Sequence, residues 1–271
     1  MWATRRRGHV TWPGKSRRPC LSIKAITFDF WATLYTSNPV DRHRRLRELQ
    51  QMVEQRAGVS LTMEAVQAAV RVARKTWTRV WMEEYRTLTT DEWLEIMLAE
   101  LHLPLPAADR SEIQHRLATS VYEDLPTLVP DAAEALPQLA RTYRLAVISD
   151  TGLTPGWVLR ELMARDGILP YFDHLTFSDE LGRSKPHPDA FLSTLRALGV
   201  EPAEAVHVGD LLRTDIAGAK GVGMRGVQYT GVNQEEWVAA ADTPAQGVNP
   251  DAVIRRHTEL ARLLRQWENG D

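Results

Sequence analysis

The chain has 271 residues, of which 44% are apolar and 25% are charged, with a single cysteine. This composition excludes a wholly disordered or collagen-like chain, and the length suits one large domain or a core with a smaller module. Because Cys20 is the only cysteine, the chain has no intramolecular disulfide and no cysteine-based zinc site. No apolar run reaches the roughly 18 residues that a membrane helix needs. We therefore expect a soluble, cytoplasmic protein without a membrane partner.

The charge is unevenly distributed along the chain. Residues 1–20 carry six basic and no acidic side chains, so 27 basic and 35 acidic residues remain in the rest. This acidic remainder offers no spread-out basic face, which argues against a nucleic-acid partner. No apolar stretch follows Arg5–Arg7, so a secretory signal is not expected. We interpret residues 1–20 as a disordered extension.

The first structural signal is the run LSIKAITFDF at residues 21–30, which is mostly apolar, β-prone and ends near Asp29. Such a run is typical of a buried parallel strand. Residues 40–124 instead show helical periodicity without a comparable β run. Within them, Thr89 and Glu92 form the sequence pattern of a capping box at a helix start. Trp77 and Trp81, four residues apart, are expected to pack on the inner face of these helices.

From Asp131 onward, strand and helix patterns alternate. We expect helices at 132–140, 155–165, after 188 and around 216–219, and strands at 143–150, 174–178, 205–210 and 225–229. This alternation predicts an α/β fold with a doubly wound parallel sheet. The first strand is separated from the others by the helical stretch. The predicted organisation is therefore a core of residues 21–36 and 125–271, with an α-helical domain inserted at 37–124.

Polar residues follow three of the predicted strands. Asp29 ends the first, Ser149 and Asp150 the second, and Asp210 the strand at 205–210, while Lys185 precedes a helix. Taken singly, a strand-terminal Asp is often a helix cap, a Ser-Asp pair a turn, and a Lys-Pro a solvated loop. In an open parallel sheet, however, ligands bind beyond the carboxyl ends of the strands. The sequence therefore predicts that these side chains form one site.

Four segments, ITFDFWATLY, AVISDT, RSKPHPDAF and HVGDLLRTD, occur in this order between residues 23 and 229. With them the chain resembles the haloacid dehalogenase (HAD) superfamily. The resemblance implies a Rossmann-like core with a helical cap between the first two motifs. It also implies that Asp29 is the nucleophile, that Ser149 hydrogen-bonds the transferred group, and that Lys185 holds the phosphoryl oxygens. Asp210 would be a Mg²⁺ ligand, with Asp215 as its supporting carboxylate.

The chemistry of the implied reaction explains these residue types. An aspartate can attack phosphorus or carbon to form an acyl-phosphate or ester that water then hydrolyses. Mg²⁺ takes hard oxygen ligands. Here they would be Asp29, Asp210 and, by the resemblance, the backbone carbonyl of Trp31. Ser149, Asp150 and Lys185 are the predicted substrate-binding residues. The predicted function is that of a magnesium-dependent phosphatase acting on a small phosphorylated molecule.

The chain departs from the family's pattern at two adjacent positions. Trp31 stands where phosphatases of the superfamily usually have a general-acid Asp, and Ala32 where Gly is usual. An indole has no titratable proton in the useful range. Three interpretations follow: a phosphatase that works without this acid or uses another proton carrier such as His187 or His43, a 2-haloacid dehalogenase, or a catalytically impaired member that binds a phosphorylated ligand or a protein. Dehalogenases of the family need no metal, so the Gly209-Asp210 pair favours the phosphatase.

Overall fold

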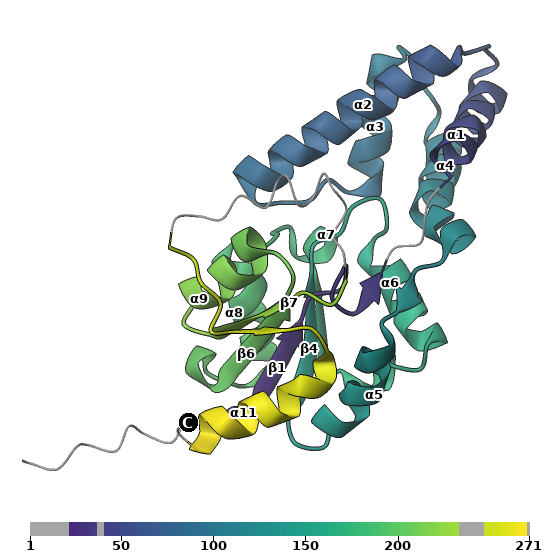
Figure 1. The fold of residues 1–271 in the computed structure, drawn as a ribbon. Coiled ribbons are helices and arrows are strands. Elements are labelled where there is room, and N and C mark those ends of the chain that lie inside the picture. The colour runs from purple at the N-terminus through teal and green to yellow at the C-terminus, as the bar shows by residue number, and fades with distance from the viewer. Residues whose placement is uncertain (1–21, 37–40, 233–246, 270–271) are drawn as a thin grey trace, which may run out of the picture.

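The computed structural model describes residues 22–36, 41–232 and 247–269 (Figure 1). At its centre is a six-stranded sheet whose neighbouring strands all run parallel. In spatial order the strands are β5 (His174–Phe177), β4 (Arg144–Ser149), β1 (Ala25–Phe28), β6 (Ala205–Gly209), β7 (Arg225–Tyr229) and β8 (Ala252–Ile254). Both segments of the predicted core, before and after the helical stretch, contribute to this sheet.

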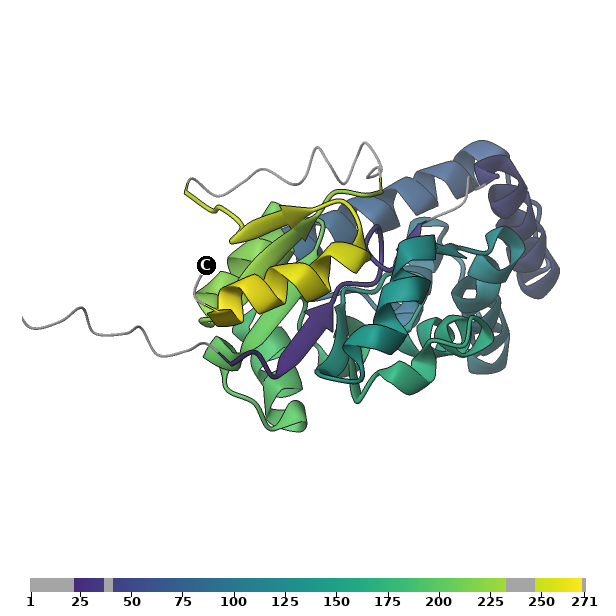
Figure 2. The ribbon, with the colours of Figure 1, turned by 60° about the horizontal axis from the view of Figure 1, so that its bottom comes forward.

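Helices cover both faces of the sheet, so the predicted doubly wound α/β fold is confirmed. Alternate residues of β1 point to opposite sides: Ile26 and Phe28 enter one apolar cluster, and Ala25 enters another. The first cluster includes side chains of α5 (Pro130–Leu139), α6 (Gly156–Arg165) and α11 (Leu260–Asn269), and the second those of α8 (Pro188–Leu198) and α9 (Ala217–Gly221). Figure 2 shows α11 lying along the sheet. Because both faces of the sheet are covered, all four residues of β1 are buried, and its sequence is mostly apolar without alternation of polar and apolar residues.

Short helical segments connect the main elements. They are α7 (Ser178–Leu181), the 3₁₀ turns η3 (Leu169–Tyr171), η4 (Pro202–Glu204) and η6 (His257–Glu259), and the π-helix η5 (Leu212–Ile216). The sequence analysis did not predict β8 or α11. β8 has three residues, too few to show alternation. α11 was missed, although its buried Leu260 and Leu264 have the spacing of a helical apolar face. Among the described residues, no helix has the length and apolar character that crossing a membrane requires.

The inserted helices form a layer beyond the carboxyl ends of the strands (Figure 1). We call this part, residues 42–124, the helical module. It contains α1 (Arg42–Ala57), α2 (Met63–Arg79), the π-helix η1 (Val80–Glu84), α3 (Thr90–Glu100), α4 (Ala107–Thr119) and the 3₁₀ turn η2 (Ser120–Asp124). Its helices share an apolar cluster of their own. An antiparallel pair, β2 (Tyr35–Thr36) and β3 (Thr127–Leu128), joins the chain where it leaves and re-enters the core.

Local signals inside the module agree with the structure. The Thr89 hydroxyl accepts from the backbone N–H of Glu92, and the Glu92 carboxylate accepts from that of Thr89, so the predicted capping box is present. Trp77 and Trp81 stack with their ring centroids 5.3 Å apart. The predicted boundary at residue 37 and the predicted extension at residues 1–20 lie outside the described residues.

Helix α9 packs closely against α8, and this contact gives a test of the core. A Cβ on Gly218 would lie 2.4 Å from Cε2 of Phe191 and 3.1 Å from the Cα of Pro186, next to Lys185. We therefore expect G218A to lower the free energy of unfolding by about 1–3 kcal/mol, as overpacking typically does. Urea unfolding followed by circular dichroism measures the change.

The matched control is G221A on the same helix, where an added Cβ meets no atom within 4 Å. Since Ala is the better helix former, G221A should be neutral or stabilising by up to about 1 kcal/mol. Equal stability of G218A and G221A would contradict the packing argument.

Candidate active site

The strand order brings the predicted site residues together. Because β1 lies between β4 and β6, the residue that follows β1 is flanked by Ser149 at the end of β4 and by Asp210 just after β6. The backbone N–H of Asp29 extends the β1–β6 ladder by donating to the carbonyl of Val208 at 2.8 Å. Asp29 is 6% exposed and therefore lies at the bottom of this edge.

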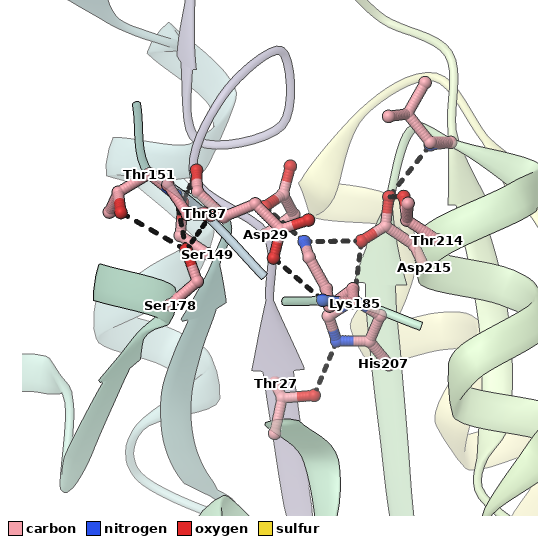
Figure 3. A network of polar contacts seen from close by, with 12 residues as sticks. Thr27, Asp29, Thr87, Ser149, Thr151, Ser178, Lys185, His207, Thr214 and Asp215 are labelled. Carbon is pink, nitrogen blue, oxygen red and sulfur yellow. Dashed lines mark hydrogen bonds and ion pairs between the residues drawn. The ribbon is translucent and has the colours of Figure 1, made fainter. Parts of the chain in front are cut away.

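Lys185 joins the carboxylates of Asp29 and Asp215 (Figure 3). Its Nζ lies 2.5 Å from Oδ1 of Asp29 and 2.7 Å from Oδ1 of Asp215, and the side chain is only 2% exposed. Burial alone would lower the pKa of this ammonium, but the attraction of the two carboxylates outweighs it and raises the pKa. Lys185 is therefore a fixed positive charge in the site.

Asp215 is held by donors from several sides. Besides Lys185, the ring of His207 donates to Oδ1 at 3.0 Å, and the backbone N–H of Leu211 donates to Oδ2 at 2.9 Å. Burial favours the neutral acid, yet the Lys185 charge and the His207 bond keep the pKa of Asp215 below its usual range. Gly209 makes room for this arrangement, since a Cβ there would lie 2.3 Å from Cγ of Asp215. This geometry fits the supporting role that the sequence predicts for Asp215.

His207 and Thr27 form a buried polar pair beneath the site. They lie opposite each other on β6 and β1, and Oγ1 of Thr27 is 2.8 Å from Nδ1 of His207. Burial lowers the pKa of His207, which favours the neutral ring at neutral pH. Since Nε2 donates to the Asp215 carboxylate, Nδ1 accepts from the Thr27 hydroxyl. The role of Thr27 was missed, although a polar residue in each of two apolar strands is a signal for such a pair.

Three carboxylates crowd the site: oxygens of Asp29, Asp210 and Asp215 lie within 4.8 Å of one another. Burial raises the pKa of Asp29 to about 7 despite Lys185. Burial and the repulsion of Asp215 and Asp29 raise the pKa of Asp210 well above its ordinary value. When ionised, the three acids outweigh the single charge of Lys185, and their oxygens are the ligand type that Mg²⁺ prefers. The residues therefore fit a divalent cation.

The remaining predicted residues lie around this cluster. Ser149 is 2% exposed at the end of β4, and its hydroxyl donates to the carbonyl of Asp150 at 3.2 Å. Asp150 accepts hydrogen bonds from the backbone N–H of Lys185 and from the indole N–H of Trp81 in the helical module. Trp31 is half-buried and packs edge-on against Phe30, with ring centroids 4.9 Å apart. His187, considered above as a proton carrier, accepts from the backbone N–H of Asp189 at 3.2 Å and caps α8.

Sequence comparison identifies the family. The profile of the haloacid dehalogenase-like hydrolases matches residues 23–223. The chain belongs to this family. This hydrolase is 28% identical over 249 residues to a glyceraldehyde 3-phosphate phosphatase of Methanopyrus kandleri, covering 90% of this chain and 98% of the relative. It is 29% identical over 242 residues to a ribulose-1,5-bisphosphate 5-phosphatase of Halopiger xanaduensis, covering 89% and 98%.

Structural comparison agrees on the fold. A 2-haloacid dehalogenase from Pseudomonas syringae pv. Tomato superposes with a TM-score of 0.63 at 24% identity, covering 90% of this hydrolase and 99% of that chain. At this identity the likeness concerns the fold. The family and the fold class expected from the four motifs are thus confirmed, whereas the individual site roles stay predictions.

The carboxylate cluster predicts how stability depends on pH. In the metal-free protein, folded Asp29 and Asp210 keep protons that the unfolded chain loses near pH 4, so stability should fall as the pH rises from about 4 through 7. D210N removes one of these ionisations, so its folding stability should fall less between pH 4 and 7 than that of wild type. At pH 8, metal-free D210N should be more stable than wild type by about 1 kcal/mol or more. Mg²⁺ should stabilise D210N less than it stabilises wild type.

Thermal unfolding at pH 5 and pH 8, with and without MgCl₂, measures both effects. The control is D91N, an exposed carboxylate in the first turn of α3, which should follow wild type under all four conditions. If D210N were destabilised at pH 8 and still gained full stabilisation from Mg²⁺, the cluster would not be a cation site.

Proposed function

We propose that this hydrolase is a magnesium-dependent phosphatase that acts through an aspartyl-phosphate on Asp29. The observation that carries the proposal is the buried set of Asp29, Asp210 and Asp215 around Lys185. This set combines a nucleophile, a fixed ammonium and an excess of carboxylate oxygens. The names of the curated relatives, a glyceraldehyde 3-phosphate phosphatase and a ribulose-1,5-bisphosphate 5-phosphatase, support a small phosphorylated substrate.

The proposed reaction has two displacements at phosphorus. A carboxylate oxygen of Asp29 attacks the phosphorus atom, an O–P bond forms, and the bond to the leaving oxygen breaks with its electron pair. Water then attacks the aspartyl-phosphate, which releases phosphate and restores Asp29. Lys185 neutralises charge on the nucleophile and the phosphoryl oxygens, and the Ser149 hydroxyl donates to those oxygens. Mg²⁺, held by Asp29, Asp210 and the carbonyl of Trp31, would supply charge neutralisation at the phosphoryl group.

The helical module fits the role of a cap in this proposal. It stands beyond the carboxyl ends of the strands and has its own apolar cluster. Asp29 directly follows the carboxyl end of β1, and Lys185 pairs with it. We place its boundaries at residues 37 and 124, as the sequence predicts. A module at this place excludes water and contacts the part of the substrate that does not react.

A hydrolysis screen tests the proposed function directly. It uses p-nitrophenyl phosphate, glyceraldehyde 3-phosphate and 2-chloropropionate, each with MgCl₂ and with EDTA. A phosphatase releases phosphate from the esters only with Mg²⁺. Release of chloride without Mg²⁺ would instead identify a 2-haloacid dehalogenase, for which an aromatic residue at position 31 is acceptable because halide leaves without a proton. Turnover of none of the three would favour the impaired, ligand-binding member.

The covalent mechanism predicts the effect of removing the nucleophile. D29N replaces the carboxylate with an amide, which is a poor nucleophile, so kcat should fall more than about 10³-fold. The melting temperature should change little, because burial raises the pKa of Asp29 and disfavours its charge, and Lys185 keeps its ion pair with Asp215. The D91N control should keep full activity. Activity of D29N within about tenfold of wild type would rule out attack by Asp29.

The missing general acid predicts a dependence on the leaving group. Without an acid at position 31, the leaving oxygen departs with its negative charge, so aryl and acyl phosphates should react faster than alkyl phosphates. W31D should raise kcat/KM for alkyl phosphates selectively, since general acid catalysis contributes about 10² to 10⁴ in rate. The gain will be smaller if the half-buried indole leaves a cavity.

The matched control is W31N, which has the shape of W31D without its acid and should show no gain. Rates for p-nitrophenyl phosphate and glyceraldehyde 3-phosphate measure the selectivity. Equal rates for both esters in wild type would contradict a missing acid and make H187A the next variant.

A further inference from the structure

Asp150 connects the helical module to the catalytic lysine. Its Oδ2 accepts from the indole Nε1 of Trp81 at 2.8 Å, and its Oδ1 accepts from the backbone N–H of Lys185 at 2.9 Å. Trp81 belongs to η1 of the module, whereas Asp150 follows β4 of the core. The sequence predicts Asp150 as a substrate-binding residue, yet each of its oxygens already accepts a hydrogen bond from the protein.

A second bond fixes the same stretch of backbone. The N–H of Ser184 donates to the carbonyl of Tyr85, also in the module, at 2.8 Å. The N–H of Ser184 thus donates to the module directly. The N–H of Lys185 donates to Asp150, whose carboxylate in turn accepts from Trp81 of the module. Ser184 and Lys185 are both buried. The backbone position of Lys185 therefore depends on the segment from Trp81 to Tyr85.

The indole of Trp81 is itself held in orientation. It is 4% exposed, stacks on Trp77 with an interplanar angle of 16°, and has the guanidinium of Arg213 4.3 Å from its ring centroid. Trp81 and Arg213 come from the π-helices η1 and η5. Stacking and cation–π contacts act on the ring faces. They leave the ring edge, with its N–H, directed at Asp150.

We infer that Trp81 is a positioning residue, which acts through Asp150 to set the place of Lys185. The inference rests on the proposed function, in which Lys185 holds the nucleophile and the phosphoryl group. Nζ of Lys185 contacts Asp29 at 2.5 Å, so a shift of its backbone moves the ammonium relative to the nucleophile. Displacements of about 1 Å can cost as much as 10²-fold in rate. In this proposal, Lys185 is correctly placed for catalysis only when the helical module contacts the core through Trp81 and Asp150.

The test removes the indole N–H and keeps the ring. W81F retains an aromatic surface for Trp77 and Arg213 but cannot donate to Asp150. We expect kcat for p-nitrophenyl phosphate with MgCl₂ to fall about tenfold, and the Kd for inorganic phosphate, measured by calorimetry, to rise about threefold.

The matched control is W93F in the same module. The Trp93 side chain is buried, and its Nε1 has no hydrogen-bond partner among the described residues. W93F therefore removes the same atoms without removing a bond to the core. It should keep kcat within about twofold of wild type. A similar loss of kcat in W93F and W81F would assign the effect to general destabilisation and overturn the inference.

A double-mutant cycle with D150N separates positioning from substrate binding. The Asn amide can accept from the Lys185 N–H but cannot also accept from Trp81 through its nitrogen. If the two residues act as one unit, W81F/D150N has the kcat of D150N alone. If the separate losses of kcat in W81F and D150N multiply in the double variant, the inference is overturned. It is also overturned by a D150N variant that raises KM at unchanged kcat, since that result assigns Asp150 to the substrate. If W81F does not fold, D150N with a lowered kcat supports the inference.

The phosphate titration distinguishes this inference from the proposed function. A wild type that binds phosphate but hydrolyses no ester overturns the proposed function, and the inference then depends on whether W81F weakens phosphate binding. A wild type that neither binds phosphate nor hydrolyses esters overturns both. An active wild type with a W81F variant of equal kcat and Kd overturns the inference alone.

Discussion

The ion pairs of Lys185 with Asp29 and Asp215 are the interaction on which the site depends. All three side chains are nearly or fully withdrawn from water. Burying an isolated ammonium is expensive, and breaking a buried ion pair typically costs about 3–5 kcal/mol because the remaining charge is left uncompensated. The surrounding donors and the glycine at position 209 fit this arrangement closely. The same contacts that stabilise the carboxylate of Asp215 also leave the ammonium in reach of Asp29.

Much of the fold could be predicted because its signals are local. The buried run of β1 and the alternation after Asp131 follow from periodicity, and the Thr89–Glu92 capping box spans only four residues. The sheet order then brings Asp29, Ser149 and Asp210 to one edge. The contact of Trp81 with Asp150 could not be predicted in this way. It joins residues 69 positions apart, and its geometry depends on two π-helical turns that have no pattern in the sequence.

Two carboxylates of the site, Asp29 and Asp210, lower the folding stability of the metal-free protein when they are ionised. The raised pKa values of Asp29 and Asp210 mean that their charged forms are disfavoured in the folded, metal-free protein. By contrast, Lys185 and His207 keep the pKa of Asp215 below its usual range despite its burial. The chain thus contains one carboxylate that its own donors stabilise and two that gain most from a cation. This difference is consistent with the roles proposed above, in which Asp215 is a supporting carboxylate and Asp29 and Asp210 are metal ligands.

The loop after β1 gives a physical reason to separate backbone and side-chain roles at position 31. Ala32 has a φ of 53°, in the left-handed region, where an L-residue costs roughly 1–2 kcal/mol and Gly does not. The turn is closed by the bond from Ala32 N–H to the carbonyl of Tyr35 and by that from Tyr35 N–H to the carbonyl of Phe30. The left-handed turn therefore persists with Ala in place of the usual Gly. A carbonyl ligand at position 31 needs only this backbone, whereas proton transfer needs an acidic side chain. In the proposed mechanism, replacement of the usual Asp by Trp31 therefore affects leaving-group protonation and leaves the proposed metal ligand in place.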